Sequence, residues 1–171
     1  MPDATSPVVL LQSYLIAVAA VLLGIASLND IATRTIPDLA PLGLTVIGVM
    51  LRVVDGTTAA ALAASAAVLL VGALCWRFGW LGGGDVKLLA AATLWAGPGG
   101  TLPLLALMGL LGGLLGLFVL SPICPDFAGF RRRLPLGPSE VATGHTNPVV
   151  VPYGAAIAAA ALIVTIPPSF S

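Results

Sequence analysis

The stretch VVLLQSYLIAVAAVLLGIASL runs from Val8 to Leu28 and contains no charged residue. A helix needs roughly 20 apolar residues to cross the hydrocarbon core of a bilayer, and this stretch has 21 (8 to 28). Further apolar runs follow it at Leu39 to Val54, Thr57 to Trp76, Val86 to Ala96, Leu102 to Leu120 and Val149 to Ile166. The sequence therefore predicts six membrane-spanning segments, of which the fourth is short and the second contains Arg52 near its end.

The composition agrees with a membrane protein. Hydrophobic residues make up 58% and charged residues 8% of the 171 positions, and the mean hydropathy is +1.09. This is too little charge to cover a water-soluble globule of this size. Because the runs are long and show no ten-residue alternation, we expect an all-α, polytopic transmembrane bundle of about six helices rather than a barrel, with residues 1–171 as one membrane domain. The net charge of zero suggests no nucleic-acid partner.

Basic residues are placed unevenly along the chain. Arg34, Arg77, Lys87 and the triplet Arg131 to Arg133 fall in the first, third and fifth connections, whereas Arg52 falls on the opposite side. By the positive-inside rule, the first set faces the cytoplasm and both termini lie outside. Two aspartates, Asp30 and Asp85, are thereby predicted to share the cytoplasmic face.

Asp30 lies where the first apolar run ends, in the stretch Asp30-Ile31-Ala32-Thr33-Arg34-Thr35-Ile36-Pro37. A charged residue at a membrane boundary costs little free energy. Taken alone, Asp30 is compatible with a helix-end charge that pairs with Arg34 four residues later.

Asp85 lies in the stretch Gly82-Gly83-Gly84-Asp85-Val86-Lys87-Leu88-Leu89. The local chemistry is compatible with a helix N-cap, because Asp is a good N-cap and Gly breaks helices. The run of glycines also exposes backbone and lets another chain approach closely beside a carboxylate. The stretch fits neither a dinucleotide-binding nor a P-loop signature.

Together these two stretches resemble the type IV prepilin peptidases. That family places one Asp before an Arg-x-Ile-Pro turn and a second Asp in a Gly-x-Gly-Asp-x-Lys-Leu-Leu motif. The last apolar run, which opens with Val151-Pro152-Tyr153-Gly154, is similar to the family's closing helix. Three motifs in the family's order extend the resemblance over nearly the whole chain.

The resemblance implies a membrane aspartic endopeptidase that removes the short basic leader from prepilins at the cytoplasmic face of the bacterial inner membrane. It implies Asp30 and Asp85 as the catalytic pair, with neither a metal nor another cofactor. Gly82, Gly84 and Lys87 in the second motif, and Arg34 and Pro37 in the first, are its motif and substrate-approach residues. The partners that it implies are a prepilin or pseudopilin substrate and the lipid bilayer, and the sequence assigns no oligomeric state.

Paired carboxylates suit this chemistry, because two that lie close together share a proton and provide both a general base and a general acid. Lys87 could act on Asp85 electrostatically or extend to lipid phosphates.

The chain departs from the family's pattern at two points. Asp38 stands where the family usually has Asn after the proline, and the large Cys-containing insert of the longer members is missing. The second departure suggests the compact form associated with Flp or Tad-type pili, in which we expect no N-methyltransferase activity.

Two other functions stay open on the sequence. The Gly-x-Gly-Asp motif is also compatible with a preflagellin peptidase or a presenilin-like protease. A small transporter or assembly subunit could use the same aspartates to bind a cation or a proton at helix breaks.

The remaining polar residues are interpreted without a catalytic role. Cys75 and Cys124 lack zinc-ligand spacing and are expected to be inert thiols. Arg131 to Arg133 are expected to anchor the topology, and His145 is expected to be a solvated loop residue. Two interleaved GxxxG patterns, Gly109 with Gly113 and Gly112 with Gly116, favour close helix packing.

Overall fold

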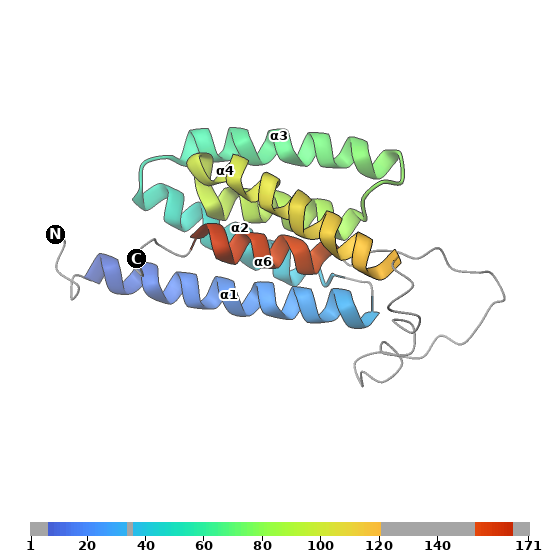
Figure 1. Cartoon of the computed structure of the whole chain (residues 1–171). Coiled ribbons are helices and arrows are strands. Elements are labelled where there is room, and N and C mark those ends of the chain that lie inside the picture. The colour runs from blue at the N-terminus through green and yellow to red at the C-terminus, as the bar shows by residue number, and fades with distance from the viewer. Residues whose placement is uncertain (1–6, 34–35, 121–152, 166–171) are drawn as a thin grey trace.

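The computed structural model describes residues 7–33, 36–120 and 153–165, and five helices account for most of them. The helices are α1 (Pro7–Thr33), α2 (Leu39–Val54), α3 (Thr58–Arg77), α4 (Gly83–Leu120) and α6 (Tyr153–Thr165) (Figure 1). The described part of the chain contains no strand. The predicted all-α class is confirmed, and α2 has the bounds of the second apolar run.

Helix α4 consists of two arms that run in opposite directions (Figure 1). They meet at Gly97, whose φ of 78° and ψ of 176° lie outside the helical range. Glycine adopts a positive φ without steric cost, and Pro98 starts the second arm without needing an N–H partner. The two arms contain the fourth and fifth apolar runs of the sequence and each begins a few residues earlier, so the predicted break between those runs is a turn at one residue.

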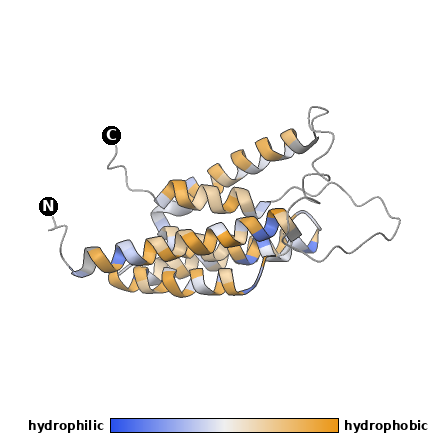
Figure 2. Cartoon of the chain, turned by 90° about the horizontal axis from the view of Figure 1, so that it is seen from below, coloured by the Kyte–Doolittle hydropathy of each residue, from blue (hydrophilic) through white to orange (hydrophobic). Residues whose placement is uncertain are grey.

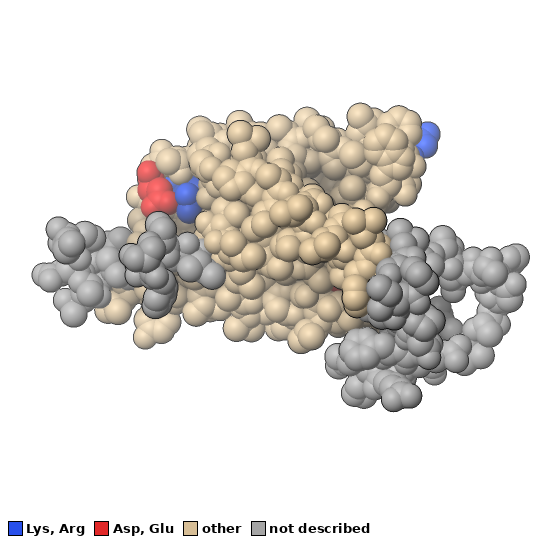
Figure 3. Space-filling model, in the orientation of Figure 1, with Lys and Arg blue, Asp and Glu red and all other residues tan. Residues whose placement is uncertain are grey.

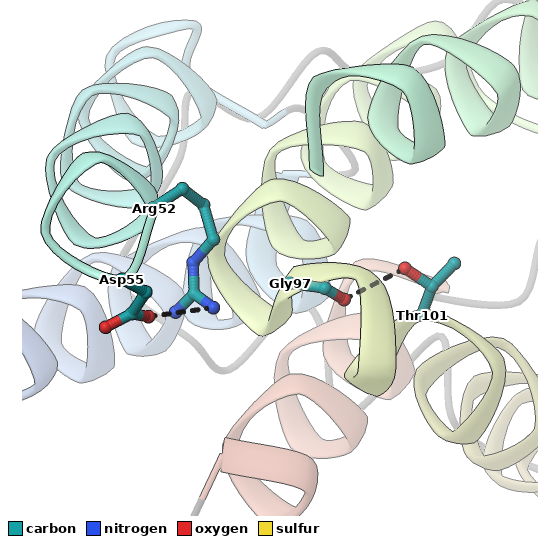
Figure 4. A network of polar contacts seen from close by, with 4 residues as sticks. All are labelled: Arg52, Asp55, Gly97 and Thr101. Atoms are coloured by element: carbon teal, nitrogen blue, oxygen red, sulfur yellow. Dashed lines mark hydrogen bonds and ion pairs between the residues drawn. The ribbon is translucent and has the colours of Figure 1, made fainter. Parts of the chain in front are cut away.

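Arg52 of α2 packs against this turn (Figure 4). A Cβ built at Gly97 would lie 3.1 Å from the guanidinium carbon of Arg52, so the position needs glycine for space as well as for its φ. The Nη1 atom of Arg52 lies 3.1 Å from Oδ2 of Asp55, and the Thr101 hydroxyl donates to the Gly97 carbonyl at 3.0 Å. Arg52, predicted as the exception to the charge bias, is thus partly buried and paired.

Small residues let the helices approach closely. A Cβ at Gly48 of α2 would lie 3.0 Å from the backbone nitrogen of Trp95 in the first arm of α4. On the other side of that arm, Ser65 of α3 donates its hydroxyl hydrogen to the Ala90 carbonyl at 2.8 Å. The first arm therefore lies between α2 and α3 with little side-chain space on either side.

Only one of the two GxxxG patterns contacts another described helix. A Cβ at Gly112 would lie 2.9 Å from the Tyr153 ring of α6, whereas nothing lies within 4 Å of such an atom at Gly109 or Gly113. Because residues 112 and 113 differ by one position on a helix, adjacent glycines face in different directions.

The outer surface of the bundle is largely apolar (Figure 2). Three helices contain segments long and apolar enough to cross a membrane: Leu10–Ala32, Thr58–Arg77 and Gly83–Phe118. The charged residues visible on the face shown in Figure 3 lie near the two ends, and the described residues between them are uncharged. The buried core cluster contains side chains of α1, α2, α4 and α6, among them Leu23, Leu44, Leu88, Trp95 and Ile157, and Val68 of α3 packs against it.

The close approach at Gly48 predicts the effect of a single methyl group. Gly48→Ala places its Cβ against the backbone of α4, which cannot rotate away as a side chain can. We expect the variant to lose about 1 to 3 kcal/mol of unfolding free energy, measured by denaturant titration in detergent. The matched control is Gly113→Ala, for which we expect no loss, since nothing lies within 4 Å of the new atom. Equal stability of the two variants would contradict the packing described for α2 and α4.

Candidate functional site

Asp30 lies in the last turn of α1 with 6% of its surface exposed. Its Oδ2 atom accepts a hydrogen bond of 2.9 Å from the backbone N–H of Gly154, 124 residues away in the first turn of α6. Free N–H groups at a helix N-terminus carry partial positive charge and favour a nearby carboxylate. Asp30 therefore faces into the bundle, where α6 holds it. Arg34, the partner considered from the sequence, lies outside the described residues.

Gly154 leaves no room for a side chain at this contact. A Cβ built on it would lie 2.8 Å from Oδ2 and 3.0 Å from Cγ of Asp30. The sequence motif Pro152-Tyr153-Gly154 indicated a closing helix but no contact with Asp30. A glycine at the second position of a helix was the only available signal, and it does not identify the carboxylate that the helix will meet.

Asp85 lies in the first turn of α4, with 9% of its surface exposed. It is the third residue of the helix rather than the N-cap that the local sequence also allowed. The Val86 N–H donates to the Gly82 carbonyl at 3.2 Å, so the turn that precedes Asp85 already has helical hydrogen bonding.

The three glycines before Asp85 are each close to another group. A Cβ at Gly82 would lie 2.8 Å from Oδ2 of Asp85 itself, one at Gly83 would lie 3.4 Å from the Trp76 indole nitrogen, and one at Gly84 would lie 3.2 Å from Cβ of Ile36. Gly84 therefore lets the first motif approach the second within the same chain. Gly82 is exposed, so its backbone is open to another molecule.

Both aspartates line one pocket of about 260 Å³. The pocket lies between the end of α1, the connection that leads into α2, and the start of α4. Its lining residues are Asp30, Ile36, Asp38, Gly82, Gly83, Gly84, Asp85 and Lys87. Five residues singled out from the sequence therefore meet in one place: both aspartates, Gly82, Gly84 and Lys87. Pro37 lies exposed in the connection but does not line the pocket.

An ion pair lies at the pocket's exposed edge. Nζ of Lys87 is 2.8 Å from Oδ1 of Asp38, and 56% and 79% of the respective side chains are exposed. Such an exposed pair contributes at most about 1 kcal/mol to stability. The sequence suggested that Lys87 acts on Asp85 or extends to lipid phosphates. Neither role involves Asp38.

The charges of the pocket favour a cationic ligand. Three of its lining residues are aspartates and one is a lysine, so its potential is negative when the aspartates are ionised. Its volume exceeds the roughly 30 Å³ that one water occupies several times over. Two buried carboxylates and room for water are the requirements of acid and base catalysis on a water molecule.

Other predicted features lie elsewhere. Within residues 7–33, 36–120 and 153–165, no three His, Cys, Asp or Glu side chains are grouped as metal ligands would be. Cys75 is a free, half-buried thiol of α3. Cys124, Arg131 to Arg133 and His145 lie outside the described residues.

Comparison with known proteins adds an independent observation. The model of the type IV leader peptidase family matches residues 17–117, which include both aspartates and end before Gly154. A search of the curated proteins and a search of the solved structures each found no match. The family match covers more than half of the chain and includes every residue that lines the pocket, and the chain belongs to the type IV leader peptidase family.

Proposed function

We propose that the protein is a membrane aspartic endopeptidase that cleaves the short basic leader from type IV prepilins, with Asp30 and Asp85 as its catalytic pair. The observation that carries this proposal is the common pocket, which is lined by two buried aspartates from different helices, Asp30 of α1 and Asp85 of α4, 55 positions apart in the chain. Membership of the leader peptidase family and three helices long enough to cross a membrane support a protease in a multi-pass membrane protein.

The proposed mechanism needs one proton shared by the two carboxyl groups. The ionised carboxylate accepts a proton from a water whose oxygen attacks the scissile carbonyl carbon. The protonated carboxyl group donates a hydrogen bond to the carbonyl oxygen, which becomes negatively charged as the tetrahedral intermediate forms. When the C–N bond breaks, the departing amine receives a proton from the pair, which regenerates the starting state.

Gly154 has a positioning role in this mechanism. Its N–H, in the first turn of α6, donates a hydrogen bond to Oδ2 of Asp30. The carboxylate therefore keeps one orientation when water and substrate enter. A general base that is oriented in advance avoids reorganisation during the reaction.

The charges of the pocket and of the connections support the proposed substrate and membrane face. A pocket with three aspartates suits the basic leader of a prepilin. Arg77 and Lys87 flank the connection that leads into the pocket, and Arg52 is paired with Asp55 at the other end of α2. The positive-inside rule then assigns the pocket to the cytoplasmic face of the inner membrane. The sequence lacks the Cys-containing insert of the longer family members, so we extend the proposal to a Flp or Tad-type prepilin and to an enzyme without N-methyltransferase activity.

The paired mechanism predicts that neither aspartate is dispensable. Asp30→Asn and Asp85→Asn each keep the size of the side chain but remove a proton donor and acceptor. We expect each to lower kcat by at least about 100-fold in a cleavage assay with the purified, reconstituted protein and a candidate prepilin. The matched control is Asp55→Asn, the same substitution at the other end of α2, which should keep a normal kcat. Normal cleavage by either pocket variant would refute the pair, and a transporter or assembly subunit would show no cleavage in any variant.

The contact at Gly154 predicts a second loss. Gly154→Ala brings a methyl group to within about 3 Å of the Asp30 carboxyl group and must displace it. A displacement of about 1 Å at a catalytic group can cost on the order of 100-fold in rate, so we expect kcat to fall about 10- to 100-fold with little change in KM. Gly109→Ala, which meets nothing within 4 Å, serves as the control. An unchanged kcat in Gly154→Ala would show that α6 does not position Asp30.

A further inference from the structure

The outer face of α2 carries one continuous apolar stripe. Its members are separated by three or four positions, so they line up along one side of the helix. All are largely exposed in the structure: Leu39 (77%), Leu42 (62%), Val46 (47%), Met50 (53%) and Val53 (61%). In the described part of the chain no other element covers them, and in a multi-pass membrane protein an apolar stripe of this kind faces lipid.

This stripe is short. Fourteen steps separate Leu39 from Val53, and at 1.5 Å per residue they span about 21 Å. The hydrocarbon core of an ordinary bilayer is about 30 Å thick. A helix that is too long can tilt, whereas a helix that is too short gains nothing by tilting and is matched where the bilayer is thinner.

Two ion pairs mark the ends of the stripe. Asp38, immediately before α2, pairs with Lys87 at 2.8 Å, and Arg52 in the last turn pairs with Asp55 at 3.1 Å (Figure 4). Charged side chains avoid the hydrocarbon core. Asp38 and Asp55 are 17 positions apart, about 26 Å along a helix, so the hydrocarbon beside α2 must fit between them.

From this length and these charges, we propose that the protein thins the bilayer beside α2 to a hydrocarbon thickness of about 21 to 25 Å, with lipid acyl chains as the occupant of the stripe. The inference concerns the protein's interaction with lipid and does not depend on the proposed peptidase activity.

The lengths of the neighbouring helices restrict the proposed thinning to the bilayer beside α2 and the first arm of α4. The first arm of α4, residues 83–96, is about 21 Å long and packs against α2 at Gly48 and Arg52. Helix α3, with 20 residues, is about 30 Å long and is therefore matched to an ordinary bilayer. Only residues 55–57 connect α2 to α3, so the end of α2 and the start of α3 lie at the same depth in the bilayer. Because α3 is longer, its end lies at a different depth from the start of α2.

The two helices differ in depth at the end of the bundle where the pocket lies. The starts of α2 and of the first α4 arm lie roughly 6 to 9 Å closer to the bilayer centre than the end of α3, if the axes are parallel. The end of α3 and the loop that follows it carry the exposed aromatic side chains Trp76, Phe78 and Trp80, which suit the headgroup region. Thinning beside α2 lets the aqueous boundary reach a pocket that would otherwise be level with acyl chains.

Depth measurements on the reconstituted full chain test this proposal. In a Cys75→Ser, Cys124→Ser background, nitroxide spin labels are placed singly at Leu42, Val46 and Val53 of α2, and at Ala67 near the middle of α3 as the matched control. All four side chains are exposed in the structure, so labels should not disturb packing. Depth is obtained from the relative accessibility of each label to oxygen and to a water-soluble nickel complex in bilayers with eighteen-carbon monounsaturated chains.

We expect the deepest α2 label, at Val46, to lie about 3 to 4 Å shallower than the label at Ala67, with interfacial depths at Leu42 and Val53. Equal depths at Val46 and Ala67 would overturn the proposal. Labels on α2 that are shielded from both reagents would overturn it as well, because protein rather than lipid would then cover the stripe. A shallow α2 together with no prepilin cleavage would refute the proposed function and leave this inference standing.

Discussion

A carboxylate that is buried among apolar helices needs hydrogen-bond donors from the protein, since apolar side chains and lipid tails offer none. Gly154 supplies such a donor to Asp30, and this hydrogen bond joins the first helix of the bundle to the last. It requires α6 to begin at the level where α1 ends, and α6 in turn packs against both α1 and α4. The pocket, its charges and the position of α4 all depend on the start of α6 lying level with the end of α1.

Glycine allows a sharp reversal or a close approach of the backbone at three separate places in the bundle. Gly97 reverses α4 with a positive φ, Gly84 lets Ile36 approach the turn before Asp85, and Gly154 lets the α6 backbone reach Asp30. In each case a side chain would occupy space that another part of the chain already fills. Segments from α1, the connection to α2 and α4 can therefore meet in one pocket, although every helix around them is made almost entirely of apolar residues.

Much of this arrangement could be predicted from the sequence because the bilayer imposes it. Predominantly apolar runs of sufficient length specify helices, and α2 and the two arms of α4 lie where the runs lie. The uneven distribution of basic residues led us to expect Asp30 and Asp85 on one face, and the structure puts both in one pocket. These features depend on local composition or on a simple charge rule.

The contacts within the site could not be predicted in the same way. The bond from Gly154 to Asp30 joins residues 124 positions apart, and the Lys87 to Asp38 pair joins residues 49 apart. Both depend on how far each helix is displaced along its neighbour, which small packing differences decide. The local sequence suggests only nearby partners, Arg34 for Asp30 and lipid phosphate for Lys87, and Arg34 lies outside the residues that the structure describes. The single-residue reversal at Gly97 was likewise predicted only as a gap between two apolar runs.

In the mechanism that we propose, Asp30 and Asp85 act on one water molecule. The most direct test is the separation of their carboxyl groups in an experimental structure of the reconstituted protein with a non-cleavable prepilin peptide bound. The account predicts that the nearest carboxyl oxygens lie within roughly 3 to 7 Å, with the scissile carbonyl beside both. Carboxyl groups more than about 10 Å apart in that complex, too far to share one water, would contradict it.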